Sequence, residues 1–109
     1  MFKRAYCIFY KNLYIGDSIK HPSKVKWKLT HGAGQFLVYV ITKSETPGNQ
    51  LEIIHCAYLK QSYFRNHPVF VYGIAGSYDE AIDIIIKISS EASASGMDGR
   101  LLDYLEGNS

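Results

Sequence analysis

The sequence contains few cysteines and no long apolar run. Two cysteines among 109 residues cannot build the several disulfides that hold small secreted domains together, so we expect both thiols to be free. The longest apolar stretches, such as Phe36–Ile41, fall far below the roughly 18 residues needed to cross a bilayer. Met1–Ala5 leads into a mixed run broken by Lys11, unlike the uninterrupted apolar region of a signal peptide. We therefore expect a cytoplasmic protein that does not enter a membrane.

Motifs for metal, cofactor and nucleophilic chemistry are missing as well. The four histidines are scattered, with no Cys-x-x-Cys or His-x-x-x-His spacing, and no Gly-x-Ser-x-Gly nucleophile elbow occurs. The neighbours His55 and Cys56 would point to opposite faces of a strand and could not easily act together as base and nucleophile. The sequence predicts no cofactor and favours a non-enzymatic protein over an enzyme.

The composition is typical of a globular chain, and the charges are unevenly distributed along it. Apolar residues make up 47% of the sequence and charged residues 20%, and the length fits one domain over residues 1–109. Residues 1–31 carry seven Lys and Arg with Asp17 as their one acid, whereas residues 32–109 carry five basic and nine acidic residues. This distribution permits a nucleic-acid or acidic partner, and equally an attraction between the two parts of the chain.

Runs of β-forming residues predict two hairpins and one further strand. Each hairpin has a turn-forming segment between two apolar runs, and the last strand ends at a glycine. The expected strands are Ala5–Tyr10 and Leu13–Ile15 around Lys11-Asn12, Phe36–Thr42 and Leu51–Leu59 around Thr46–Asn49, and Val69–Tyr72 before Gly73.

A long helix is expected after the last strand. Ser77 and Glu80 have the spacing of a capping box, in which the two side chains satisfy backbone N–H groups at a helix start. Gly96 is expected to end this helix, and a short helix over Gly99–Leu105 should follow. The sequence thus predicts an α+β fold: a mainly antiparallel sheet of about five strands, with the long helix on one face. The other face stays open, and an apolar surface left there would predict a partner or a dimer.

The segment 22–32 supports two interpretations. Lys24–Leu29 alternates polar and apolar residues, which favours a strand with a basic outer face. A short helix that begins at Pro22 or Ser23 and ends at Gly32 is the alternative, because Lys and Leu are good helix formers. We favour the strand.

The same segment is a candidate nucleic-acid contact through Lys24, Lys26, Trp27 and Lys28. Lysines can neutralise phosphates, and a tryptophan offers a plane on which a base can stack. In a strand, however, Trp27 would lie opposite the lysines, and a core tryptophan behind a solvated lysine edge is the interpretation we favour.

Two further segments are candidate sites. Gly73–Ser77 leads into a helix start, where free N–H groups at Gly73, Gly76 and Ser77 could receive an anion, although turn geometry explains these glycines more simply. The chain also holds nine tyrosines, and Tyr63, Phe64 and Arg65 form a candidate interface.

These observations order three hypotheses of function. The first is a non-enzymatic intracellular interaction module that associates with itself or with a protein partner. The second is a nucleic-acid-binding domain that uses the basic segment 20–31. The third is a small ligand-binding or enzymatic domain around the Gly73–Ser77 turn.

Overall fold

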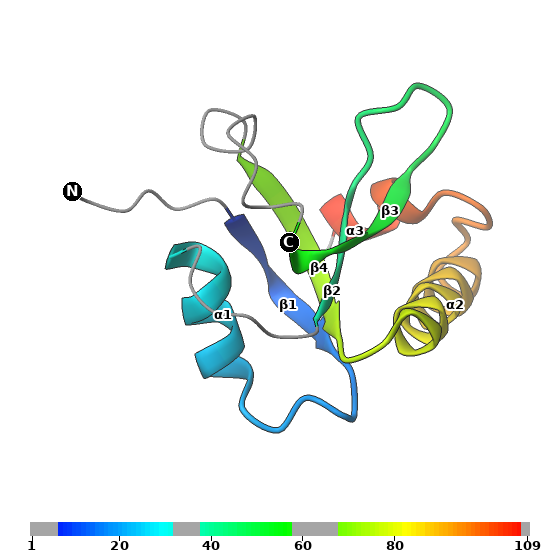
Figure 1. Ribbon diagram of the computed structural model, residues 1–109. Coiled ribbons are helices and arrows are strands. Elements are labelled where there is room, and N and C mark those ends of the chain that lie inside the picture. The colour runs from blue at the N-terminus through cyan, green and yellow to red at the C-terminus, as the bar shows by residue number, and fades with distance from the viewer. Residues whose placement is uncertain (1–6, 32–37, 58–67, 108–109) are drawn as a thin grey trace.

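A mixed β-sheet forms the centre of the protein (Figure 1). The computed structural model describes residues 7–31, 38–57 and 68–107. Four strands in these ranges lie in the order β1-β4-β2-β3, with β1 parallel to β4 and β2 antiparallel to both of its neighbours. They are β1 (Cys7–Ile15), β2 (Tyr39–Lys43), β3 (Leu51–His55) and β4 (Val69–Ala75). The α+β class is confirmed, but the expected five-stranded, mainly antiparallel sheet is wrong.

The expected first hairpin does not form, because β1 continues through its expected turn at Lys11-Asn12. Cys7–Phe9 pair in parallel with Val69–Val71 of β4, and the pairing resumes at Tyr14 opposite Gly73. The four residues between therefore stand opposite a single residue of β4. The turn-forming pair produces a wide irregularity in an edge strand instead of a reversal.

The second hairpin is confirmed in β2 and β3, which pair from Tyr39 opposite His55 to Lys43 opposite Leu51. In its turn, the N–H of Asn49 donates to the carbonyl of Thr46 at 3.1 Å. Gly48 has a φ of 91°, a left-handed conformation that glycine adopts without a steric penalty. The strand expected to reach residue 59 ends earlier, at residue 55, and residues 36, 37, 58 and 59 lie outside the described residues.

The long helix α2 (Tyr78–Ala94) begins and ends as expected. The Ser77 hydroxyl accepts the N–H of Glu80 at 3.1 Å, which is one half of the capping box. At the other end, Gly96 has a φ of 80°, and the N–H of Met97 donates to the carbonyl of Ala92 at 2.7 Å. These two features form a Schellman motif, which satisfies the last carbonyls of the helix.

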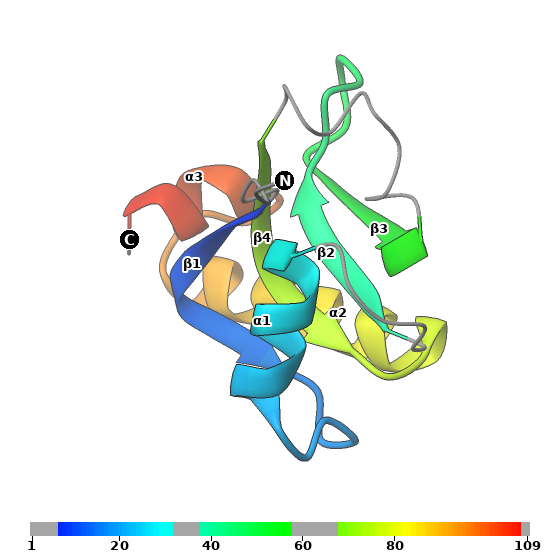
Figure 2. The same ribbon diagram turned by 60° about the vertical axis from the view of Figure 1, so that its left-hand side comes forward.

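Helices cover the two faces of the sheet (Figures 1 and 2). α2 and the short helix α3 (Leu101–Gly107) lie on one face, and α1 (Pro22–His31) lies on the other. The strand that we favoured for residues 22–32 is therefore wrong, and the alternative helix is correct. Because α1 packs on the second face, that face is not a bare apolar surface.

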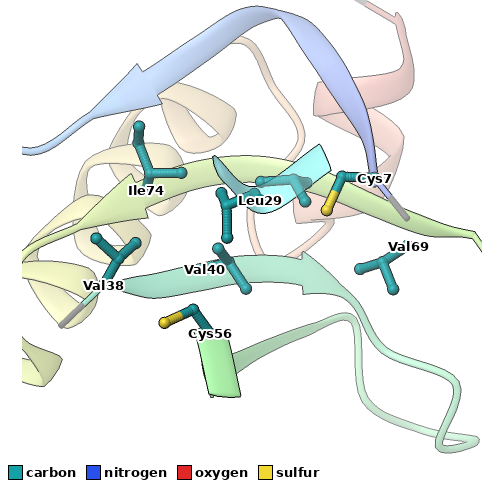
Figure 3. Packing of buried hydrophobic residues seen from close by; sticks show 8 residues of the cluster. Cys7, Leu29, Val38, Val40, Cys56, Val69 and Ile74 are labelled. Carbon is teal, nitrogen blue, oxygen red and sulfur yellow. The ribbon is translucent and has the colours of Figure 1, made fainter. Parts of the chain in front are cut away.

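Each face of the sheet has its own hydrophobic cluster. The α1 face holds the cluster shown in Figure 3, in which Leu29 of α1 packs among strand residues such as Val40 and Ile74. On the α2 face, Ile41 and Ile88 pack with Leu105 of α3. This burial of Leu105 confirms that the short terminal helix lies against the body of the domain. The sheet is thus the middle of three layers, and α1 is the smaller outer layer.

Candidate binding surface on helix α1

Local sequence explains why α1 forms and where it starts. Pro22 is its first residue, a position that suits proline because its ring fixes φ near the helical value and no N–H is needed there. The carbonyl of His21 accepts the N–H of Val25 at 3.1 Å, which closes the first helical turn. No acidic residue follows in the helix, whose sequence is PSKVKWKLTH.

One side of α1 is buried against the sheet. Leu29 is only 3% exposed and belongs to the cluster on this face, and Val25, one turn earlier, packs against the same cluster. The apolar residues that suggested a strand therefore divide in two. Val25 and Leu29 are four residues apart and share the buried side of a helix.

Trp27 lies on the other side of α1 and is 57% exposed. At 3.6 residues per turn, a residue two positions from both Val25 and Leu29 falls on the opposite side of the helix. The core tryptophan that we favoured from the sequence is therefore wrong. A large aromatic ring instead stands on the outer surface of the protein.

The lysines of α1 lie around this tryptophan rather than behind it. Lys24 is three residues before Trp27, so the two side chains are neighbours on the helix surface, and Lys28 follows Lys24 by one turn. Lys26 leans to the flank, where its Nζ lies 5.5 Å from the centre of the Phe9 ring. We call the surface formed by Lys24, Trp27 and Lys28 the outer face of α1.

The fold converts the uneven charge of the sequence into two differently charged layers. Residues 16–31, which contain α1 and the loop before it, carry four lysines and Asp17. Residues 76–107, which contain α2 and α3, carry seven carboxylates with Lys87 and Arg100. The two layers lie on opposite faces of the sheet, as Figure 2 shows for α1 and α2. An anionic ligand is thus attracted to the α1 side and repelled from the other.

At the predicted anion site, an internal carboxylate already accepts a backbone N–H. Glu80 accepts the N–H of Gly76 at 2.7 Å, and also the N–H and hydroxyl of Ser18 at 3.0 and 2.7 Å. The bond from Gly76, followed by those from Ser18, lowers the pKa of Glu80. An external anion here would have to displace Glu80. Gly73 lies apart from this network, in β4 beneath α2, where an added Cβ would meet Ile84 at 3.4 Å.

The fold does not bring the candidate cysteine and histidine side chains together. Cys7 and Cys56 both belong to the buried cluster on the α1 face, and burial raises the pKa of Cys7 to about 12. His55 instead contacts Tyr39, ring to ring at 5.1 Å, and Tyr39 packs against the cluster on the α2 face. Across the described residues, no group of three or more His, Cys, Asp or Glu is placed to hold a metal ion.

The predicted interface at Tyr63, Phe64 and Arg65 lies outside the described residues, and so do residues 32–34. Elsewhere, Tyr10, Tyr14 and Tyr72 make contacts within the protein. The Tyr10 and Tyr72 rings meet edge to face with centres 5.2 Å apart, and Tyr14 donates to a carboxylate oxygen of Glu91 at 2.5 Å. Burial, followed by this contact with Glu91, raises the pKa of Tyr14.

One further surface feature, which the sequence did not predict, is a groove over the first residues of β1 and β4. Its lining includes Ile8, Phe70, Lys43 and Glu106, from three strands and α3. Strand geometry puts Ile8 and Tyr10 on one face of β1, but no local pattern could show that β1 and β4 are neighbours.

Comparison with other proteins found no match. No protein family matches the sequence, and neither the curated proteins nor the solved structures compared with it gave a match. No helix in the described part of the chain is long and apolar enough to span a bilayer.

Proposed function

We propose that the protein is a non-enzymatic binding module that holds single-stranded nucleic acid on the outer face of α1. The observation that carries this proposal is the exposure of Trp27 beside Lys24 on the basic layer of the protein. An exposed tryptophan next to lysines supplies the two elements needed to bind single-stranded nucleic acid of any sequence. The ring is a plane on which a base can stack, and the lysines are cations for the phosphates.

Two features of α1 support a nucleic-acid ligand, and the second favours a single strand over a duplex. The helix has no acidic residue, so no carboxylate within it repels a phosphate. Trp27 projects from a convex helix surface and can stack only on a base that is already unstacked from its neighbours.

Titration of labelled nucleic acid tests the proposal. A fluorescent single strand of about 20 nucleotides, longer than the roughly 4–16 nucleotides that a small domain covers, is compared with its duplex by anisotropy. We expect saturable binding to the single strand, accompanied by quenching of Trp27, the only tryptophan. With three lysines near the strand, log K should fall against log salt with a slope of roughly −2, because each phosphate neutralised on a single strand contributes about −0.7.

Two results would count against the proposal. Equal binding to duplex and single strand with no change in Trp27 fluorescence would remove the stacking contact from the proposal. No binding of either form at about 50 mM salt, where phosphate contacts are strong, would overturn it. The interaction-module hypothesis would then be left, with a protein as the ligand.

A further inference from the structure

The groove over β1 and β4 exposes two large apolar side chains. Ile8 of β1 and Phe70 of β4 are partners in the parallel register, and they are 48% and 46% exposed. Apolar side chains that are adjacent and this open form a patch rather than two scattered surface residues. The groove has a volume of about 380 Å³. We refer to it as the β1/β4 groove.

This groove lies on the α2 face of the sheet, next to the surface that α3 covers. Tyr10 and Tyr72 follow Ile8 and Phe70 by two residues, so all four side chains point to the same face. The two tyrosines lie within the buried cluster of that face, and Tyr10 donates its hydroxyl hydrogen to the carbonyl of Leu105 at 2.9 Å. The covered surface thus stops at α3, and the apolar surface continues beyond it.

Charges of both signs stand side by side on the rim. Lys43 Nζ and Glu106 Oε2 are 3.2 Å apart, and both side chains are about half exposed. Lys43 Nζ also lies 6.0 Å from the centre of the Phe70 ring. An apolar patch with a cation and an anion on the same rim can complement a copy of itself, since a two-fold axis that runs between the two charges presents each Lys43 to the other copy's Glu106.

We infer that the β1/β4 groove is the interface of a two-fold dimer of this chain. Ile8 and Phe70 of the two copies pack together at its centre, and each Lys43 pairs with Glu106 of the second copy. β1 is an edge strand of the sheet, so a second copy can approach this side. The α1 helices lie on the opposite face of the sheet and stay available, so the inference is independent of nucleic-acid binding.

Measurement of mass in solution tests the dimer. Light scattering and sedimentation of the full chain should give twice 12.3 kDa, with dissociation on dilution. Phe70→Glu should raise the dissociation constant by about 30-fold, a size typical of a central interface side chain. Ile86→Glu is the matched control, because Ile86 is 57% exposed on α2 outside the groove, and it should leave the mass unchanged. A wild-type monomer throughout, or a dimer unaffected by Phe70→Glu, would overturn the inference.

Reversing the charges on the rim shows whether Lys43 of one copy pairs with Glu106 of the other. Lys43→Glu and Glu106→Lys should each weaken the dimer, because each places like charges opposite one another at both rims. A mixture of the two variants should recover a dimer, since each copy then offers the charge that the other lacks. An ion pair within one copy cannot be restored by mixing. Dimers of either variant alone, or a mixture that stays monomeric while the circular dichroism of each variant is native, would contradict the crossed contact.

Discussion

Trp27 and Leu29 are two residues apart in α1 and lie on opposite sides of it: Leu29 is buried in the core, and Trp27 is exposed on the surface. The two apolar residues look equivalent in the sequence, but one is part of the core and the other is part of the surface. Leu29 attaches the helix to the sheet, whereas more than half of the Trp27 side chain is exposed at the surface. The two side chains should therefore affect stability and binding in opposite ways.

Leu29→Ala should lower the free energy of unfolding by about 2–5 kcal/mol, because it removes buried methyl groups and leaves a cavity beneath α1. Trp27→Ala should change it by less than about 1 kcal/mol, as is usual for an exposed position. Urea unfolding followed by circular dichroism measures both. A larger loss of stability for Trp27→Ala than for Leu29→Ala would contradict the orientation of α1.

The double substitution Lys24→Gln with Lys28→Gln should weaken single-strand binding and make the salt slope shallower by about 1.4, or about 0.7 for each phosphate that is no longer neutralised. Lys87→Gln is the control, because Lys87 lies on α2 in the acidic layer on the other side of the sheet. It removes a charge without touching the outer face of α1. A change in slope half as large in Lys87→Gln, which removes one charge instead of two, would mean that net charge, rather than the outer face of α1, attracts the nucleic acid.

Glu80 should make stability depend on pH in the acid range. Its pKa is lowered below its ordinary value of 4.5 by the bonds from Gly76 and Ser18, so its ionised form is favoured by folding. This contribution is fully present above the ordinary pKa and is lost as the pH falls through the lowered one. In Glu80→Gln the loss of stability from about pH 5 to about pH 3 should be smaller than in the wild type. Parallel stability curves for the two proteins would contradict a role for the Glu80 carboxylate in joining the loop at Ser18 to α2.

Tyr10→Phe should cost about 1–2 kcal/mol, because it removes the donor to the Leu105 carbonyl and leaves a buried acceptor without that partner. Tyr78→Phe is the matched control, since Tyr78 is exposed and its ring contact with Tyr39 is retained. Thermal unfolding of both variants measures the difference. Similar midpoints for the two would show that the Tyr10 hydroxyl does not hold α3 to the sheet.

The parts of the fold that depend on local chemistry could be predicted from the sequence. Ser77 caps α2 with its own side chain, Gly96 ends the helix through a conformation that favours glycine, and the turn at Thr46–Asn49 reverses the chain within four residues. Each signal acts over a few neighbouring residues. Tertiary contacts did not override any of them.

The parts that depend on distant contacts could not be predicted. Lys11-Asn12 has sound turn chemistry, yet β1 continues because parallel pairing with β4, some 60 residues later, holds both of its ends. Residues 24–29 satisfy the period of a strand and of a helix equally, and only the burial of Leu29 against the sheet decides between them. The exposure of Trp27 follows from that decision, so the predicted position of Trp27 in the core was wrong even though the residues of the segment had been singled out. The β1/β4 groove depends on the same long-range pairing.

The most direct test of the proposed function is the affinity of Trp27→Leu for the single strand, measured beside Tyr78→Leu, which removes an exposed aromatic ring from α2. We predict that Trp27→Leu binds about 5- to 150-fold more weakly than the wild type, the cost of losing one stacked base at about 1–3 kcal/mol. Tyr78→Leu should bind as the wild type does. Unchanged affinity in Trp27→Leu would contradict the proposed function, because the outer face of α1 would then hold no base.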